Sequence, residues 1–162
     1  MQYLLILLLA FPMRAEAKVP KLHVNVQKLV YGVIQKENPK HNKKLVGDKH
    51  LKHHAYGLFQ IRAGYLADVN RLAGKKEIMR VWHKSRLALK DMEDLRKAQW
   101  VFLFYTSYYG WQYHQKTGEL ADIKICARIH NGGPDGWKKR NTKQYGKDVV
   151  HYAAAYHPRK QG

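Results

Sequence analysis

Residues 92–116 constrain the fold more than any other part of the chain. Their apolar side chains recur every three or four positions, which is the spacing of one face of an α-helix. Asp91, with Asp94 three residues later, is typical of a helix N-cap with an acidic partner, and the pair 117–118, Thr-Gly, is typical of a helix end. So long a stripe predicts the central buried helix of a small α-helical domain. The stripe comprises Met92, Leu95, Ala98, Phe102, Tyr105 and Tyr109.

The remaining patterns also favour helices. No alternating strand pattern of useful length is present, although a two-stranded ribbon can form within residues 45–60, where 56–61 contains β-friendly residues. We therefore expect a mainly α fold in one domain spanning residues 18–162. Further helices are expected at 21–36, 63–73, where Gly74 ends the pattern, 75–90, 119–129 and 144–156.

Residues 1–17 have the pattern of a secretory signal peptide. Leu4 to Phe11 is an apolar run too short to span a bilayer, and residues 15–17, Ala-Glu-Ala, match a cleavage site. Cleavage predicts a secreted or periplasmic protein that is not inserted in a membrane. An uncleaved membrane anchor is the alternative.

The formal net charge of +18 indicates an anionic partner. Teichoic acids, peptidoglycan carboxylates, lipid headgroups and nucleic acid all carry the required charge. Nucleic acid is disfavoured by the leader and by the absence of a helix-turn-helix, zinc-finger or RNP pattern. The single cysteine, Cys126, lies between apolar neighbours and is expected to be a buried small hydrophobe, since it has no partner for an internal disulfide.

Three short sequence features are informative together because of their order along the chain. Glu37 closes the first helical pattern before Asn38-Pro39; residues 55–61 read Ala-Tyr-Gly-Leu-Phe-Gln-Ile; and residues 127–134 read Ala-Arg-Ile-His-Asn-Gly-Gly-Pro. Together they resemble the lysozyme-like lytic transglycosylase family over roughly residues 21–152. The late turn is also similar to that of invertebrate-type lysozymes, but those are disulfide-rich and this chain is not.

The resemblance implies a two-lobed lysozyme-like domain with a cleft between its lobes. It implies a monomer that binds the glycan strands of peptidoglycan and cuts the β-1,4 bond between N-acetylmuramic acid and N-acetylglucosamine. Neither a metal ion nor an organic cofactor is expected. The net charge suggests anionic wall polymers as additional partners.

Glu37 is the predicted general acid and base. Pro39 disfavours helical geometry in the residue before it, so Glu37 lies where a helix gives way to a loop. Val33 and Ile34, about one turn earlier, can provide an apolar setting that raises the pKa of a carboxyl, whereas nearby lysine charges lower it. The balance between these effects is open at the level of sequence.

Asp48 is the candidate second carboxylate. It can hold water for hydrolysis or support positive charge on the sugar, while Gly47-Asp48 is equally consistent with simple turn chemistry. With Glu37 alone, the 6-hydroxyl of the muramic acid attacks and leaves a 1,6-anhydro end; with water, the product is hydrolytic.

Six further residues are predicted to contact the saccharide. Gln60 offers amide donors and an acceptor, and Gly57 permits close backbone approach. Asn131 also ends a helix, and Tyr56 can belong to core or groove. Trp137 and Tyr145 can supply stacking surface, although aromatic residues at this density are more often core. The predicted binding set is Tyr56, Gly57, Gln60, Tyr105, His130 and Asn131.

Residues 50–54, His-Leu-Lys-His-His, have spacings that can bind zinc on a helix. No local Cys, Asp or Glu completes a ligand set, so a cationic loop is the favoured interpretation and no metal site is predicted. The competing functional class is a non-catalytic cationic protein that binds the cell wall or membranes through its charge.

Overall fold

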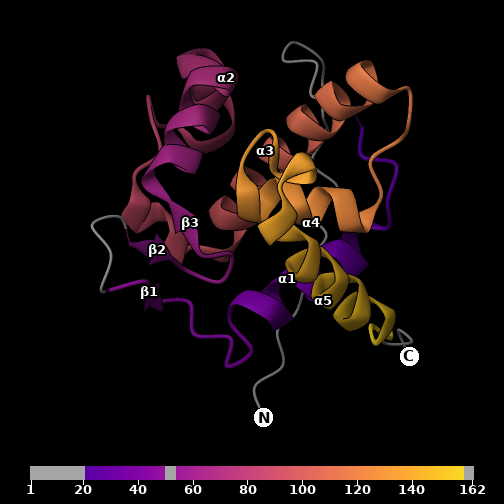
Figure 1. Cartoon of the computed structure of the whole chain (residues 1–162). Coiled ribbons are helices and arrows are strands. Elements are labelled where there is room, and N and C mark those ends of the chain that lie inside the picture. Colours follow the sequence, from indigo (N-terminus) through magenta and orange to yellow (C-terminus); the bar gives the residue numbers. More distant parts are fainter. Residues whose placement is uncertain (1–20, 50–53, 159–162) are drawn as a thin grey trace.

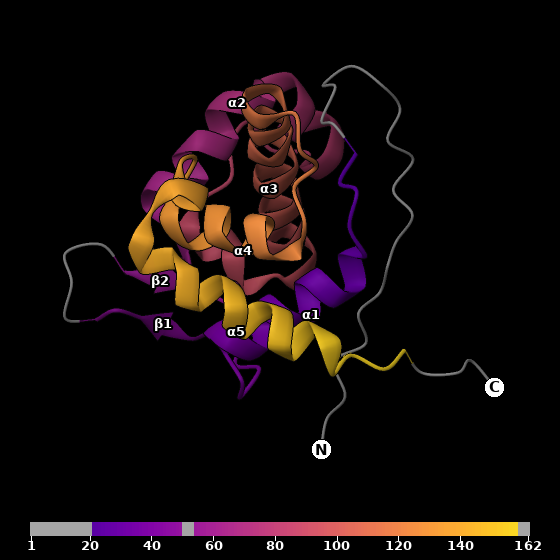
Figure 2. The same cartoon turned by 45° about the vertical axis from the view of Figure 1, so that its right-hand side comes forward.

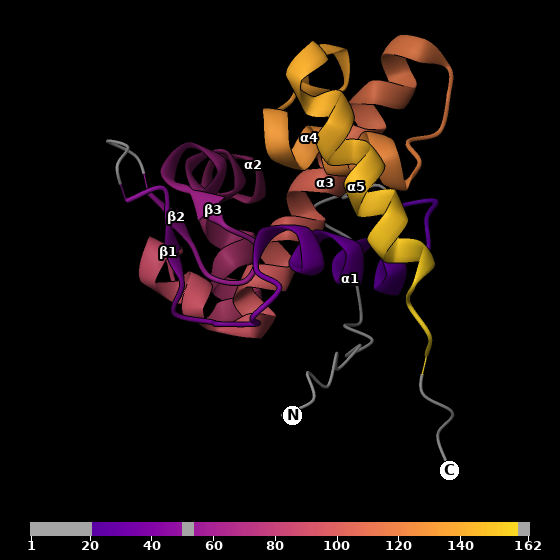
Figure 3. The same ribbon diagram turned by 60° about the horizontal axis from the view of Figure 1, so that its bottom comes forward.

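The longest helix, α3 (Leu95–Thr117), is buried along most of its length. Phe102, fully buried, stacks on Phe59 with ring centroids 4.8 Å apart, and Tyr105 stacks on Tyr65 at 3.6 Å. Figure 3 shows α3 running between α2 (Ala63–Trp82) and the sheet on one side and α4 (Ile123–Gly132) and α5 (Lys143–Ala154) on the other. The predicted central helix is therefore confirmed, and it ends at Gly118, whose φ of 77° is left-handed.

The start of α3 differs from the prediction. Asp94, not Asp91, is its N-cap, and the Asp94 carboxylate accepts hydrogen bonds from the backbone N–H groups of Arg96 and Lys97. Asp91 instead accepts from the N–H of Ala88 within a preceding 3₁₀-helix. Two aspartates three residues apart give the same local signal, and α3 begins after the second.

The computed structural model describes residues 21–49 and 54–158, and the predicted leader lies outside them. These residues are mainly helical with one small antiparallel sheet (Figure 1). In the part of the chain described, no helix is both long and apolar enough to cross a bilayer. The elements are α1 (Val26–Glu37), β1 (Val46–Gly47), β2 (Ala55–Tyr56), β3 (Ile61–Arg62), α2 (Ala63–Trp82), η1 (Leu89–Glu93), α3, α4 (Ile123–Gly132), η2 (Gly136–Lys138), η3 (Arg140–Thr142) and α5 (Lys143–Ala154).

Two helices begin later than the sequence predicted, each directly after a residue whose side chain caps it. The first helix begins at Val26, not at residue 21, because the side chain of Asn25 accepts a hydrogen bond from the N–H of Lys28. Asp122 likewise caps α4, because its side chain accepts a hydrogen bond from the N–H of Ile125. The helix therefore begins at Ile123, four residues later than predicted. Gly74 breaks helical geometry as expected, with a φ of 71°, but a second helical stretch follows it directly and α2 continues to Trp82.

The predicted ribbon is present and is larger than expected. Strand β1 pairs antiparallel with β2, and β2 pairs antiparallel with β3, so three two-residue strands form the sheet. Two of them lie within residues 45–60, and the third follows immediately. Asp48 directly follows β1, and Arg62 lies on β3, so they belong to the two outer strands on either side of β2.

Helices α1 and α5 lie side by side, as Figure 2 shows. A Cβ on Gly32 would lie 2.6 Å from the backbone oxygen of Val149, so only glycine permits this approach. Lys36 and Asp148 form an ion pair of 2.6 Å across the same contact. This packing brings the C-terminal end of α1 against the first turn of α5. Cys126 is fully buried in the core, as predicted, and burial raises the pKa of its thiol to about 12.

Candidate active site around Glu37

Glu37 is the last residue of α1, and the loop that follows it is firmly held. The Asn38 N–H donates to the carbonyl of Ile34, which ends the helix. The side chain of Asn38 then bonds Asn42 twice, donating to its carbonyl at 2.7 Å and accepting from its N–H at 3.1 Å. The Glu37 side chain is 19% exposed, so it is mostly desolvated but still reachable from solvent.

Two side chains from distant parts of the chain meet the Glu37 carboxyl. The hydroxyl of Tyr145, in the first turn of α5, donates to Glu37 Oε1 at 2.7 Å. His130 Nε2, on α4, lies 3.7 Å from the same oxygen, beyond hydrogen-bonding distance. The acid is therefore held by one donor and bordered by one imidazole.

Burial decides the proton affinity of Glu37. Desolvation is the largest effect and raises the pKa of the carboxyl above its ordinary value of 4.5. The Tyr145 hydrogen bond and the charges of Arg62 and Lys36 lower the pKa, and the charge of Asp48 raises it. The balance that sequence left open thus raises the pKa of the Glu37 carboxyl, which is the direction of shift that a general acid requires.

His130 is a neutral group in an aromatic cage. Its side chain is 3% exposed and lies edge-on to Tyr65 and Phe102, with ring centroids 5.4 and 5.0 Å away. Burial lowers the pKa of His130 to about 4, while a backbone hydrogen bond with Phe59 raises it. Near neutral pH the 3.7 Å contact with Glu37 is therefore not an ion pair. The contact of His130 with saccharide stays a prediction, and its ring lies against Glu37, Tyr65 and Phe102.

Asp48 is near Glu37 but is already paired. Arg62 on β3 donates to its carboxylate, and Asp48 has a left-handed φ of 54° in the turn after β1. Asp48 therefore shapes a turn, and its charge raises the pKa of the Glu37 carboxyl, while its part in catalysis stays a prediction. Arg62 was not anticipated, since an arginine directly after an apolar strand residue gives no functional signal.

The residues around the second motif build the scaffold of the sheet. Gly57 has a φ of 74°, and a Cβ there would lie 2.2 Å from the carbonyl oxygen of Met92. Gln60 donates through its side-chain amide to the Gly57 carbonyl at 2.7 Å. Tyr56 is half-buried and pairs in the sheet with Val46 and Ile61. The fold itself therefore requires Gly57, and one amide hydrogen of Gln60 is engaged in the turn.

The last two predicted binding residues have opposite surroundings. Asn131 is exposed on the last turn of α4, one residue after His130, and its side chain is accessible to a ligand. Tyr105 is only 2% exposed and stacks on Tyr65, so we assign it to the core and correct the expectation that it reaches a cleft.

Tyr145 contacts Glu37, although no sequence pattern indicated this contact. The sequence offered a stacking surface for sugar or a place in the core, and Tyr145 is buried with its hydroxyl donating to Glu37. Burial raises the pKa of this hydroxyl well above its ordinary value, so Tyr145 remains a hydrogen-bond donor at every physiological pH. The usable signal was its helical spacing with Val149 and Ala153, which form the buried face of α5 with it.

The residues that the structure describes do not meet the requirements of a metal site. Within residues 21–49 and 54–158, no cluster of three His, Cys, Asp or Glu side chains could hold a metal ion. His50 and His53 lie outside this range. A cavity of about 90 Å³ lies elsewhere, between residues 21–23 and the C-terminal part of α3.

No protein-family model, curated protein or solved structure matches this chain.

Proposed function

We propose that this protein is a peptidoglycan-cleaving enzyme that cuts the β-1,4 bond between N-acetylmuramic acid and N-acetylglucosamine, with Glu37 as general acid and base. The observation that carries the proposal is the Glu37 carboxyl itself, which is mostly buried, is oriented by Tyr145 and has a raised pKa. The resemblance of the motifs around Glu37, 55–61 and 127–134 supports the same reaction.

The chemistry follows from this setting. Protonated Glu37 donates its proton to the oxygen of the leaving sugar as the glycosidic bond breaks, and positive charge develops on the remaining sugar ring. The Glu37 carboxylate then removes a proton from the attacking hydroxyl, which restores the acid. Water as the attacking group gives hydrolysis; the 6-hydroxyl of the same muramic acid gives a 1,6-anhydro end.

The neighbours of Glu37 have distinct parts in this scheme. Tyr145 holds one carboxyl oxygen and stabilises the carboxylate formed after proton transfer. Asp48 adds negative charge near the developing cation, moderated by Arg62. His130 excludes water from one side of the acid without adding charge. Among the predicted saccharide contacts, we favour Asn131, because its side chain is exposed to solvent.

The wider proposal keeps the two-lobed lysozyme-like fold, with α2 and the sheet in one lobe and α1, α4 and α5 in the other. In this view the protein acts as a monomer outside the cytoplasm, after loss of residues 1–17, and needs no cofactor. The substrate lies across the end of α1, where Glu37 is 19% exposed.

The test is release of soluble fragments from purified peptidoglycan by native protein and by Glu37→Gln. Loss of a required general acid lowers the rate by roughly 10²–10⁴-fold. Glu77→Gln is the matched control, because Glu77 forms an ion pair with Arg80 on α2, away from this site. Equal rates in native protein and Glu37→Gln would refute the proposal.

A second candidate function is non-catalytic binding to walls or membranes, and the net charge of +18 favours it. Under this alternative, Glu37→Gln retains full antibacterial or wall-binding activity and no protein releases fragments. The same pair of variants therefore separates the two functions.

A further inference from the structure

One face of the molecule concentrates cations that have no acidic partner. Lys124 on α4, Arg140 in η3, and Lys143 and Lys147 on α5 are all exposed. Among the residues that the structure describes, none of the four forms an ion pair or a side-chain hydrogen bond. We call these four residues the α4–α5 basic face.

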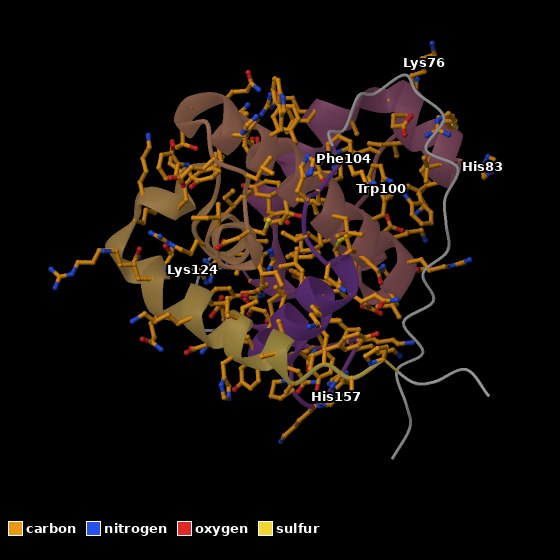
Figure 4. All side chains as sticks on the ribbon, turned by 90° about the vertical axis from the view of Figure 1, so that its right-hand side faces the viewer. Lys76, His83, Trp100, Phe104, Lys124 and His157 are labelled. Atoms are coloured by element: carbon orange, nitrogen blue, oxygen red, sulfur yellow. The ribbon has the colours of Figure 1, made fainter. Side chains whose placement is uncertain are left out.

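The packing of the two helices brings these charges together. A Cβ on Gly146 would lie 3.2 Å from Lys124 Cγ and 2.8 Å from Arg128 Cγ, so the stems of both side chains cross α5 at this glycine. Lys143 and Lys147 flank Gly146 along the helix and are four residues apart, about 6 Å of helix rise. The stem of Lys124, which is labelled in Figure 4, therefore lies against α5 at Gly146.

A buried cation adds to the positive potential beneath. Arg128 is 7% exposed, and its guanidinium donates to Thr142 Oγ1 at 3.1 Å and to the carbonyl of Lys139 at 3.0 Å. Its partners are neutral, so its charge is not cancelled locally. Residues 136–147 contain five Lys or Arg and no Asp or Glu, which makes this the strongest run of one sign near the face.

Clustering like charges costs free energy unless an anion neutralises them. We propose that the α4–α5 basic face binds a linear phosphodiester polymer carried by the cell wall, and that this contact holds the enzyme on walls that bear such a polymer. The choice of a wall polymer rests on the proposed function. The row of cations along α5 suits a chain of repeating charges better than a single ion.

One other polyanionic surface fits this face less well. A lipid surface is normally engaged by large apolar or aromatic side chains that enter it, together with cations. Val150, at 40% exposed, is the one exposed large hydrophobic residue on α5 near Lys147, and Tyr152 lies on another side of the helix. Nucleic acid shares the phosphate chemistry, and it enters the experiment as a competitor.

The experiment measures sedimentation with purified walls, before and after hydrofluoric acid removes their phosphodiester polymers. All proteins carry Glu37→Gln so that the glycan stays intact. The test variant is Lys124→Gln/Lys143→Gln/Lys147→Gln. The matched control is Lys75→Gln/Arg86→Gln/Lys90→Gln, which removes three exposed cations on α2 and in the segment after it.

The proposal predicts that the test variant binds intact walls at least about tenfold more weakly than the control variant, and that the two bind stripped walls alike. The affinity falls as the salt concentration rises. Loss of three phosphate contacts should make the slope of log affinity against log salt less steep by about two, as for single-stranded nucleic acid. Equal losses in both variants, or equal binding of the parent to intact and stripped walls, would overturn it. Stronger competition by DNA or anionic vesicles than by the released polymer would also overturn it.

The outcome is separable from that of the proposed function. If native protein releases no glycan fragments but the test variant alone loses wall binding, the enzyme assignment fails and the polymer-binding face stands. Cleavage is measured with native protein and with both triple variants in chains that keep Glu37. If all three proteins cleave intact and stripped walls equally well, the enzyme assignment stands and the polymer-binding face is refuted.

Discussion

The hydrogen bond from Tyr145 to Glu37 can be tested by Tyr145→Phe, which removes one hydroxyl and keeps the ring. The bond is 2.7 Å long and buried on the side of Tyr145. A hydrogen bond to a charged group contributes about 1.5–3 kcal/mol, and a neutral one about 0.5–1.5 kcal/mol. Because Glu37 is 19% exposed, water replaces part of the loss, and we expect a cost of about 1.5 kcal/mol when the carboxyl is ionised.

Because this cost depends on the charge of Glu37, a double-mutant cycle can show whether the hydroxyl acts on the carboxylate. Free energies of unfolding are measured by denaturant titration for native protein, Tyr145→Phe, Glu37→Gln and the double variant, well above the Glu37 pKa. We expect the hydroxyl to be worth about 1 kcal/mol less in the Glu37→Gln background, where the acceptor is neutral. The pKa of Glu37 should also rise in Tyr145→Phe, since the hydrogen bond lowers it.

The matched control is Tyr152→Phe, the same chemical change on an exposed position of α5. It should alter the free energy of unfolding by less than about 0.5 kcal/mol in either background. If Tyr145→Phe costs the same with and without Glu37, or no more than Tyr152→Phe, the hydroxyl does not serve the carboxyl and the reasoning fails.

Three further predictions concern the surroundings of Glu37. Gly57→Ala should destabilise the fold by about 2–4 kcal/mol in denaturant melts, because its φ is left-handed and Met92 blocks the space, whereas Gly64→Ala, with open space, should be neutral or stabilising. In the Glu37→Gln background, stability should fall by roughly 3 kcal/mol as pH drops from 6.5 to about 4, because unfolding lets His130 regain its ordinary pKa; no slope in this window would contradict the burial argument. Asp48→Asn should lower the pKa of Glu37 by removing a charge that raises it, so the high-pH limb of the cleavage profile moves to lower pH; an upward move would be inconsistent with the geometry.

Local signals in the sequence were sufficient for most of the helices. The stripe of residues 92–116 predicted α3, and the pair Thr117-Gly118 marked its end correctly because a glycine adopts the left-handed cap. The position of Glu37 at the end of α1 also followed from Pro39 alone. These features depend on residues within one or two turns, which is the range over which sequence patterns are informative.

Features that depend on distant contacts were not predictable in the same way. The direction of the Glu37 pKa shift depends on burial by α4 and α5, about a hundred residues later in the chain. Tyr105 and Tyr145 both lie on apolar helical stripes, yet Tyr105 stacks in the core and Tyr145 donates to the carboxyl. Which aromatic residue meets Glu37 is set by the approach of α1 and α5 at Gly32, and no local pattern encodes that approach.

The most direct test of the central claim is mass spectrometry of the fragments released from purified peptidoglycan by native protein and by Glu37→Gln. The account predicts that native protein releases muropeptides cut at the β-1,4 bond after muramic acid, and that Glu37→Gln releases at least about a hundredfold less in the same time. An anhydro end identifies attack by the 6-hydroxyl, and a reducing end identifies attack by water. Native protein that releases no such fragments, or a Glu37→Gln protein that releases as many as native, would contradict the assignment of Glu37 as the acid.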